Sequence, residues 1–318
     1  MAEKILVIGA CGQVGTELVE NLQNIHGAAN VVASDIRTSD NPVFESSAFE
    51  LMNVLDKPKI AEVFTKHKPT IVFHLAAMLS ATAEAKPKYA WQLNMEGTFN
   101  IFDACLEHKV KRVFWPSSIA VFGPSTPAVM TPQSTILEPN TVYGITKLAG
   151  ERYCEYYHAR YGLDVRSIRY PGLIGWKSKP GGGTTDYAVD IFHQALQSGS
   201  YNCFLSENTT LPMMHMEDAV RATLEITNAP SSAIKLRSSY NIAGVSFDPS
   251  GLSQEIKKHI PNFKVTYAPD SRQKIADSWP QSINDEHAKK DWGWQAKYDL
   301  EKLVVNMLEN LKTTLTSK

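Results

Sequence analysis

Short runs of apolar residues alternate with longer segments in which apolar residues recur every three or four positions in the first half of the chain. The runs predict buried strands at Lys4–Ile8, Asn30–Ser34, Thr70–His74, Arg112–Pro116 and Asp164–Arg169. The longer segments predict helices at about Gly12–Gln23, Pro87–His108 and Val142–Tyr161. Apolar strands alternating with helices are typical of a parallel sheet covered on both faces. We therefore predict an α/β chain with a doubly wound parallel sheet.

The pattern becomes less regular after about residue 172. Lys177–Thr185 is rich in Gly, Lys and Pro and predicts a loop. Helices are expected at Asp186–Gln197, Glu217–Asn228, Ser250–His259 and Asp299–Lys312, and short strands near Tyr201–Leu205, Tyr240–Ile242 and Lys264–Tyr267. We therefore expect residues 1–172 to form the main domain. Residues 173–318 would form a smaller C-terminal substrate-binding lobe, some of whose segments can return to the main domain.

A glycine-rich turn, Gly9–Gly15, lies between the first predicted strand and helix and fits the pattern G-x-x-G-x-x-G. Such a turn lets the backbone approach a pyrophosphate at the positive end of the helix dipole, as in Rossmann-type folds. Asp35 ends the next strand, 20 residues beyond Gly15, where a carboxylate accepts from ribose hydroxyls. Its charge repels a 2′-phosphate and favours NAD over NADP, although Arg37 partly offsets this. The alternative is an ordinary tight turn and a solvated Asp.

Three polar residues form a candidate catalytic set. Tyr143 and Lys147 are four residues apart, so on a helix their side chains share a face. A nearby cation and the positive charge of a nicotinamide would lower the phenol pKa from its ordinary value near ~10. Ser118 follows a predicted strand, and its hydroxyl can hold a substrate oxygen while the phenolate takes the proton. Taken singly, these residues also fit a surface helix pair and a loop cap.

Composition narrows the function classes. Lys and Arg total 32 and Asp and Glu total 33, a net charge of −1, which gives no electrostatic footprint for nucleic acid or an anionic membrane. No run reaches the ~20 apolar residues that span a bilayer, and the N-terminus lacks the pattern of a signal peptide. The four cysteines lie far apart without metal-ligand spacing. We expect a cytoplasmic protein without a metal site.

Taken together, these motifs resemble the extended short-chain dehydrogenases/reductases, the branch that contains the nucleotide-sugar epimerases. His74-Leu75-Ala76-Ala77, and Asn94 with Gly97-Thr98, add to the resemblance. It implies Tyr143 as the acid/base, Lys147 as its pKa modulator and ribose ligand, and Ser118 as the polarising hydroxyl. The cofactor-binding residues that it implies are Gly9, Gly12, Gln13, Val14, Gly15, Asp35, Ile36, Arg37, Asn53, Val54, Leu75, Ala76, Ala77, Asn94, Tyr143, Lys147, Tyr170, Pro171 and Leu173. Asn53 departs from the Asp that the family usually has near the adenine.

The second half indicates which branch of the family the chain resembles. No Asn follows the Arg169–Tyr170 strand, which argues against a sugar diphosphate as ligand. Four segments resemble the short-chain-type L-threonine 3-dehydrogenases: Pro180–Tyr187, Leu211–Met214, Asp277–Pro280 and Asp291–Trp294. That resemblance implies oxidation of the 3-hydroxyl of L-threonine by NAD to give 2-amino-3-oxobutyrate. Candidate substrate-binding residues are Ser80, Ser118, Tyr143, Gly183, Thr184, Thr185, Asp186 and Trp279, of which Asp186 could instead cap a helix and Trp279 could be core.

Two other functions stay open. A nucleotide-sugar epimerase or dehydratase would use the same Tyr and Ser but return the hydride, and a non-catalytic NAD-sensing protein would keep the fold without the chemistry. The helices Pro87–His108 and Val142–Tyr161 resemble those that form a four-helix dimer interface in this family, which implies a homodimer. The same amphipathic pattern also fits burial against the chain's own sheet.

Overall fold

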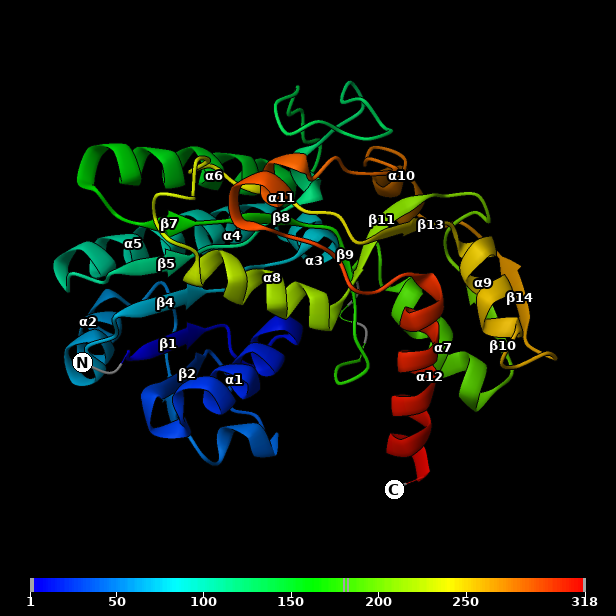
Figure 1. The fold of residues 1–318 in the computed structure, drawn as a ribbon, viewed down its shortest axis with the longest axis horizontal. Coiled ribbons are helices and arrows are strands. Elements are labelled where there is room, and N and C mark those ends of the chain that lie inside the picture. Colours follow the sequence, from blue (N-terminus) through cyan, green and yellow to red (C-terminus); the bar gives the residue numbers. More distant parts are fainter. Residues whose placement is uncertain (1–2, 180, 182, 317–318) are drawn as a thin grey trace.

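Six parallel strands form the central sheet of the computed structural model, which describes residues 3–179, 181 and 183–316 (Figure 1). The strands are β1 (Ile5–Ile8), β2 (Val31–Asp35), β3 (Ala48–Leu51), β4 (Ile71–His74), β5 (Arg112–Phe114) and β7 (Val165–Arg166). Their order is β3-β2-β1-β4-β5-β7, and every neighbouring pair is parallel. The order reverses between β1 and β4, where doubly wound sheets bind their ligands. The predicted Rossmann-type α/β fold is confirmed.

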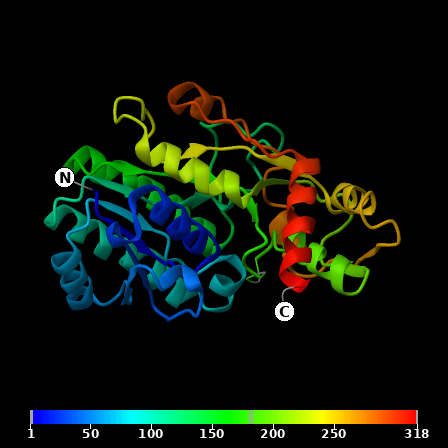
Figure 2. The same cartoon turned by 60° about the horizontal axis from the view of Figure 1, so that its bottom comes forward.

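Alternate residues of β1 face opposite layers of helices. Ile5 and Val7 pack in one cluster with residues of α1 (Gln13–His26) and α8 (Met216–Asn228). Leu6 and Ile8 pack in another cluster, with α2 (Lys57–His67), α5 (Gly97–Glu107) and α6 (Val142–Tyr161). Figures 1 and 2 show α1 and α8 side by side on the same face of the sheet. Helices therefore cover both faces of the sheet.

The predicted strand Asp164–Arg169 is wrong as a single element. β7 pairs with β5, whereas β8 (Ile168–Tyr170) pairs with β6 (Ser117–Ser118) and β12 (Tyr240–Asn241) in a second sheet. Ser167 separates the two strands, and its hydroxyl donates to that of Ser239 at 3.0 Å. A continuous apolar run indicates that a segment is buried but not which strands it pairs with. The passage of the chain from the central sheet to the second sheet was therefore not predicted. The second sheet sets Ser118 beside Tyr170.

The two long predicted helices are present. α6 begins at Val142, where the Thr141 hydroxyl accepts from the Gly144 N–H, and ends at Tyr161 before Gly162, whose φ is +74°. The segment Pro87–His108 is α4 (Pro87–Trp91), a π-helical turn (Gln92–Glu96) and α5. The short helices α3 (Ser80–Ala85), α10 (Arg272–Ala276) and α11 (Glu286–Trp292) were not predicted.

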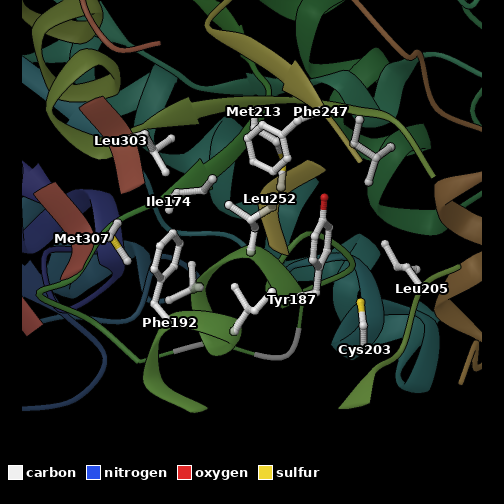
Figure 3. Close-up of a cluster of buried hydrophobic side chains, with 14 of the residues drawn as sticks. Ile174, Tyr187, Phe192, Cys203, Leu205, Met213, Phe247, Leu252, Leu303 and Met307 are labelled. Carbon is white, nitrogen blue, oxygen red and sulfur yellow. The ribbon is translucent and has the colours of Figure 1, made fainter. Parts of the chain in front are cut away.

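The smaller lobe lies at the opposite end of the molecule from α2 (Figure 1). It contains the helices α7 (Tyr187–Gln197), α9 (Pro249–Lys257) and α12 (Leu300–Thr316), close to their predicted places. Its strands are β9 (Gly172–Ile174), β11 (Leu211–His215) and β13 (Val245–Phe247) in one sheet and β10 (Ser200–Cys203) with β14 (Lys264–Tyr267) in another. Figure 3 shows Phe192, Met213, Leu252 and Met307 in its buried core.

The two halves of the chain share a core. Met214, Tyr240 and Trp294 are buried in the same cluster as Ile5 and Val7 of the first strand. The division at residue 172 stays a prediction. The loop predicted at Lys177–Thr185 contains no helix or strand among its described residues, and Pro180 and Gly182 lie outside them. In the described part of the chain, no helix is long and apolar enough to cross a membrane.

Candidate active site

The glycine turn excludes side chains at two positions. Gly9 has φ +83°, and a Cβ there would lie 2.7 Å from the backbone nitrogen of Ala76. A Cβ on Gly15 would lie 2.3 Å from the carbonyl oxygen of Gly9. Within the described residues, no side chain caps the N-terminus of α1 and its first turn holds no acidic residue. The N–H groups at this helix end are therefore suited to an anionic ligand such as a pyrophosphate.

Asp35 is held beside this turn at the end of β2. Its Oδ2 accepts from the Cys11 N–H at 2.9 Å, and its Oδ1 accepts from the Arg37 N–H at 3.3 Å. The carboxylate thus has a fixed position at the cavity wall, where it can also accept from ribose hydroxyls and repels a 2′-phosphate. Asn53 lines the same end and accepts from the Leu55 N–H at 3.0 Å.

One cavity of about 520 Å³ extends from the glycine turn to Trp279. All the candidate cofactor and substrate residues predicted from the sequence line it, apart from Asn94. They are Gly9, Gly12, Gln13, Val14, Gly15, Asp35, Ile36, Arg37, Asn53, Val54, Leu75, Ala76, Ala77, Ser80, Ser118, Tyr143, Lys147, Tyr170, Pro171, Leu173, Gly183, Thr184, Thr185, Asp186 and Trp279. The fold thus brings the dinucleotide motif, the polar trio and the loop before α7 to one place.

Asn94 lies behind the cavity instead of lining it. It is buried in the π-helical turn, and its amide donates to the Met78 carbonyl and to the Thr146 hydroxyl, both at 3.1 Å. Its Oδ1 accepts from the Met78 N–H at 2.8 Å. Asn94 therefore ties the segment after β4 to α6, and its role in cofactor binding stays a prediction.

Ser118, Tyr143 and Lys147 converge from two elements. Ser118 ends β6, and Tyr143 and Lys147 lie one turn apart on α6. The Lys147 ammonium donates to the Pro116 carbonyl at 2.6 Å and lies 5.6 Å from the centroid of the Tyr143 ring. The Ser118 hydroxyl accepts from the Ala120 N–H at 3.2 Å, which fixes its oxygen.

Burial dominates the ionisation of this trio. It raises the pKa of Tyr143 to about 12, with the Ser118 hydroxyl acting in the opposite direction. It lowers the pKa of Lys147 to about 7. Lys147 therefore does not bring the pKa of the Tyr143 phenol below its ordinary value, although the sequence led us to expect this. Desolvation disfavours both the phenolate and the ammonium ion. Additional positive charge in the cavity would lower the phenol pKa.

The loop before α7 is held by a hydrogen bond within itself. The Gly183 N–H donates to Asp186 Oδ2 at 2.8 Å. Asp186 immediately precedes α7 but does not cap it with its side chain. The Thr184 Oγ1 is buried at the cavity and has no hydrogen-bond partner within the described residues. Since a buried hydroxyl is normally paired, this oxygen is suited to a polar group of a ligand.

Several lining residues were not predicted, among them Met52, Leu79, Leu93, Pro116 and Ile119. Apolar residues carry no chemical signal in a sequence, and Pro116 contributes through its backbone carbonyl. Leu79 and Ile119 could have been found, because each follows a strand end that was identified. Among the described residues there is no group of three or more His, Cys, Asp or Glu that could hold a metal ion.

Comparisons with known proteins agree with this arrangement. L-threonine 3-dehydrogenase, mitochondrial, from Bos taurus is 45% identical over 96% of this chain and 82% of its own length. A GalE-like L-threonine dehydrogenase from Cupriavidus necator, in its holo form, superposes with a TM-score of 0.95 at 51% identity, covering 97% of this chain and 99% of that one. A monomeric L-threonine 3-dehydrogenase from a metagenome gives 0.94 at 47% identity, with 98% and 99% coverage. The family model for NAD dependent epimerases/dehydratases matches residues 5–243, and the chain belongs to this family.

Proposed function

We propose that this protein is an NAD-dependent L-threonine 3-dehydrogenase that converts L-threonine to 2-amino-3-oxobutyrate. The observation that carries the proposal is the convergence of Ser118, Tyr143 and Lys147 in the cavity that also holds the glycine turn and Thr184. The likeness to threonine dehydrogenases over nearly the full chain supports the choice of substrate.

The residues divide the chemistry between them. When bound, NAD supplies the acceptor for the hydride that leaves C3 of the substrate. The phenolate of Tyr143 removes the proton of the 3-hydroxyl, so the C3–O bond becomes a carbonyl as the C3–H bond breaks. The Ser118 hydroxyl donates to the same oxygen, and the Lys147 ammonium stabilises the phenolate.

The rest of the cavity fits a small amino acid. Thr184 offers an unpaired buried hydroxyl, and Ser80, 5% exposed, offers a second at the start of α3. Trp279 is 9% exposed and lies against the cavity, where its ring excludes water from the reacting carbon. These groups would hold the substrate's charged ends while its 3-hydroxyl faces Tyr143.

The test mixes purified protein with NAD and L-threonine and follows the absorbance of NADH. We expect stoichiometric NADH when the oxo-acid product is trapped, and none with L-serine methyl ether, which lacks a free hydroxyl. A nucleotide-sugar epimerase would give no net NADH with either compound and would interconvert a sugar nucleotide. An NAD-sensing protein would bind the dinucleotide without turnover.

We also propose that two copies of the chain associate through α4 and α6. Tyr89 and Trp91 on α4 and Tyr153 and Tyr156 on α6 expose between 38% and 50% of their surface. Exposed rings on neighbouring helices are typical of a protein interface. Sedimentation velocity tests this: wild-type protein should sediment as a dimer and Tyr156→Glu as a monomer, whereas a monomeric wild type would reject the dimer.

A cytoplasmic location is the accompanying proposal. The four cysteines are free thiols, and three of them are buried, as a reducing compartment allows. Fractionation of cells that produce the protein at native level, with blotting of each fraction, tests this. Recovery from a membrane or organelle fraction would reject it.

A further inference from the structure

The indole ring of Trp115 lies against the ammonium group of Lys147. Trp115 directly follows β5 and is 4% exposed, and its backbone N–H donates to the Arg166 carbonyl at 3.0 Å. The Lys147 Nζ lies 4.5 Å from the centroid of the indole ring, closer than it lies to the Tyr143 ring. This distance is within the range of a cation–π interaction.

Contacts on two sides hold the indole ring in place. Its Nε1–H donates to the Thr98 hydroxyl at 3.3 Å, and that hydroxyl donates to the Asn94 carbonyl at 2.7 Å. On the other side, a Cβ on Gly150 would lie 2.3 Å from Cζ2 of the indole. Gly150 is three residues beyond Lys147 on α6, so the helix leaves space for the ring just where the lysine side chain passes it.

Lys147 is buried without an acidic partner. In the part of the chain that the structure describes, no carboxylate forms an ion pair with it, and Glu151 is paired with Arg169. The titratable groups that act on Lys147 or contact it are Tyr143, Glu151 and Cys154 on α6 and His74 on β4, and Arg169 on β8 is held against Glu151. Burial keeps His74 neutral by lowering its pKa to about 3. The groups in direct contact with the ammonium ion are therefore neutral, namely the Pro116 carbonyl and the two aromatic rings, while the Glu151 carboxylate favours the charged form from beyond ion-pair distance.

We propose that Trp115 is a positioning residue, whose ring face keeps Lys147 charged and beside Tyr143. The proposal rests on the proposed function, in which Tyr143 is the base. An aromatic face attracts a cation through its quadrupole but carries no net charge. A carboxylate in the same place would offset the field of the ammonium at the phenol oxygen, whereas the indole leaves that field intact. The aromatic ring thus stabilises the cation without weakening its effect on Tyr143.

The experiment compares Trp115→Leu, Trp115→Phe and wild type across pH, at saturating NAD and L-threonine. In Trp115→Leu we expect the acid limb of the pH profile of kcat to move to higher pH by about half a unit. At pH values on that limb kcat should be about threefold lower than in wild type, and at pH values above it kcat should be unchanged. Trp115→Phe keeps a ring face and should move about half as far. A second readout is the near-ultraviolet absorbance of tyrosinate in the NAD complex without substrate, with Tyr143→Phe as the baseline. The titration of Tyr143 followed in this way should shift most in Trp115→Leu and about half as far in Trp115→Phe.

Trp294→Leu is the matched control. Trp294 is also buried, donates through Nε1 to the Ala243 carbonyl at 3.2 Å and stacks on the Arg221 guanidinium at 4.6 Å, in the cluster away from Lys147. Trp294→Leu should lower the melting temperature without moving the acid limb of the kcat profile. An unmoved limb and an unmoved tyrosinate titration in Trp115→Leu would overturn the proposal. If that variant does not fold, an unmoved titration in Trp115→Phe overturns it. Absence of NADH in wild type would reject the proposed function, while the tyrosinate titration still tests Trp115.

Discussion

Glu151 and Arg169 form an ion pair that is almost completely removed from water. Two oxygens of Glu151 accept from the guanidinium at 2.8 Å, and the side chains are 0% and 3% exposed. Glu151 also accepts from the Ser117 hydroxyl at 2.6 Å, and Arg169 donates to Asn241 Oδ1 at 3.0 Å. The pair therefore fastens α6, with Tyr143 and Lys147, to the strands that carry Ser118 and Tyr170.

Glu151→Gln should destabilise the protein strongly. The substitution leaves the buried guanidinium without its counter-ion, and breaking a buried pair costs about 3–5 kcal/mol. Urea denaturation at neutral pH measures the effect. Glu62→Gln is the control, because Glu62 pairs with Lys59 on the surface with 60% of its side chain exposed, and should change stability by less than about 0.5 kcal/mol. Similar losses in both variants would contradict the role of burial.

Gly150→Ala should disturb the active site through Trp115. A methyl group cannot fit 2.3 Å from the ring, so the indole or α6 must shift, at a cost of about 1–3 kcal/mol. We expect kcat to fall severalfold, with a lower melting temperature. Gly251→Ala in α9 has its nearest neighbour at 3.4 Å and should be neutral or slightly stabilising. Unchanged kcat in Gly150→Ala would show that the ring position does not matter.

Tyr143→Phe should abolish turnover and leave NAD binding within about twofold. Removing a general base costs about 10²–10⁴ in rate, and the phenyl ring keeps the packing. Single-turnover NADH formation and quenching of intrinsic fluorescence by NAD measure the two effects. Tyr161→Phe is the control, since Tyr161 is on the same helix with 51% of its surface exposed. Activity close to wild type in Tyr143→Phe would reject Tyr143 as the proton acceptor.

Thr184→Val should raise the KM for L-threonine by about 10- to 150-fold without changing the affinity for NAD. The hydroxyl is buried at the cavity, and a lost hydrogen bond to a charged group costs about 1.5–3 kcal/mol. Steady-state kinetics at varied L-threonine, together with an NAD titration, separates the two affinities. Equal losses of both would indicate that the loop, and not the hydroxyl, has been perturbed.

Glu17→Gln should change how stability depends on pH. Glu17 is 5% exposed, and burial raises its pKa to about 7. The folded state therefore holds this proton more tightly than the unfolded state, so wild type loses stability as pH rises from about 5 to 8. The glutamine variant should escape this loss and gain about 2 kcal/mol on wild type between these pH values. Urea denaturation at both pH values measures the free energy of unfolding of each protein. An equal change in wild type and Glu17→Gln between the two pH values would contradict the raised pKa of Glu17.

Local signals explain which elements could be predicted from the sequence. The bounds of α6 match the prediction because its cap, Thr141, and its terminator, Gly162, adjoin the periodic segment. The π-helical turn at Gln92–Glu96 was not predicted, because the segment keeps a helical pattern throughout. The break at Ser167 depends on which strands lie beside β7 and β8, and pairing is a tertiary property that an apolar run does not encode.

The candidate site shows the same limit. Ser118, Tyr143 and Lys147 were found because polar groups at strand ends and at helical spacing carry a chemical signal. Trp115 and the Pro116 carbonyl act on Lys147 as a ring face and a backbone group, neither of which a sequence pattern distinguishes from ordinary packing. The hydrogen bond from Gly183 to Asp186 is likewise a property of the folded loop.

The sharing of one core by the two ends of the chain has a thermodynamic consequence. α8 lies beside α1 on the sheet, and Trp294 is buried in the same cluster as Ile5. Removing the residues after 172 would expose that apolar face of the sheet to solvent. We therefore expect heat to unfold the two lobes in one calorimetric transition, and a fragment of residues 1–172 to aggregate instead of retaining dinucleotide affinity.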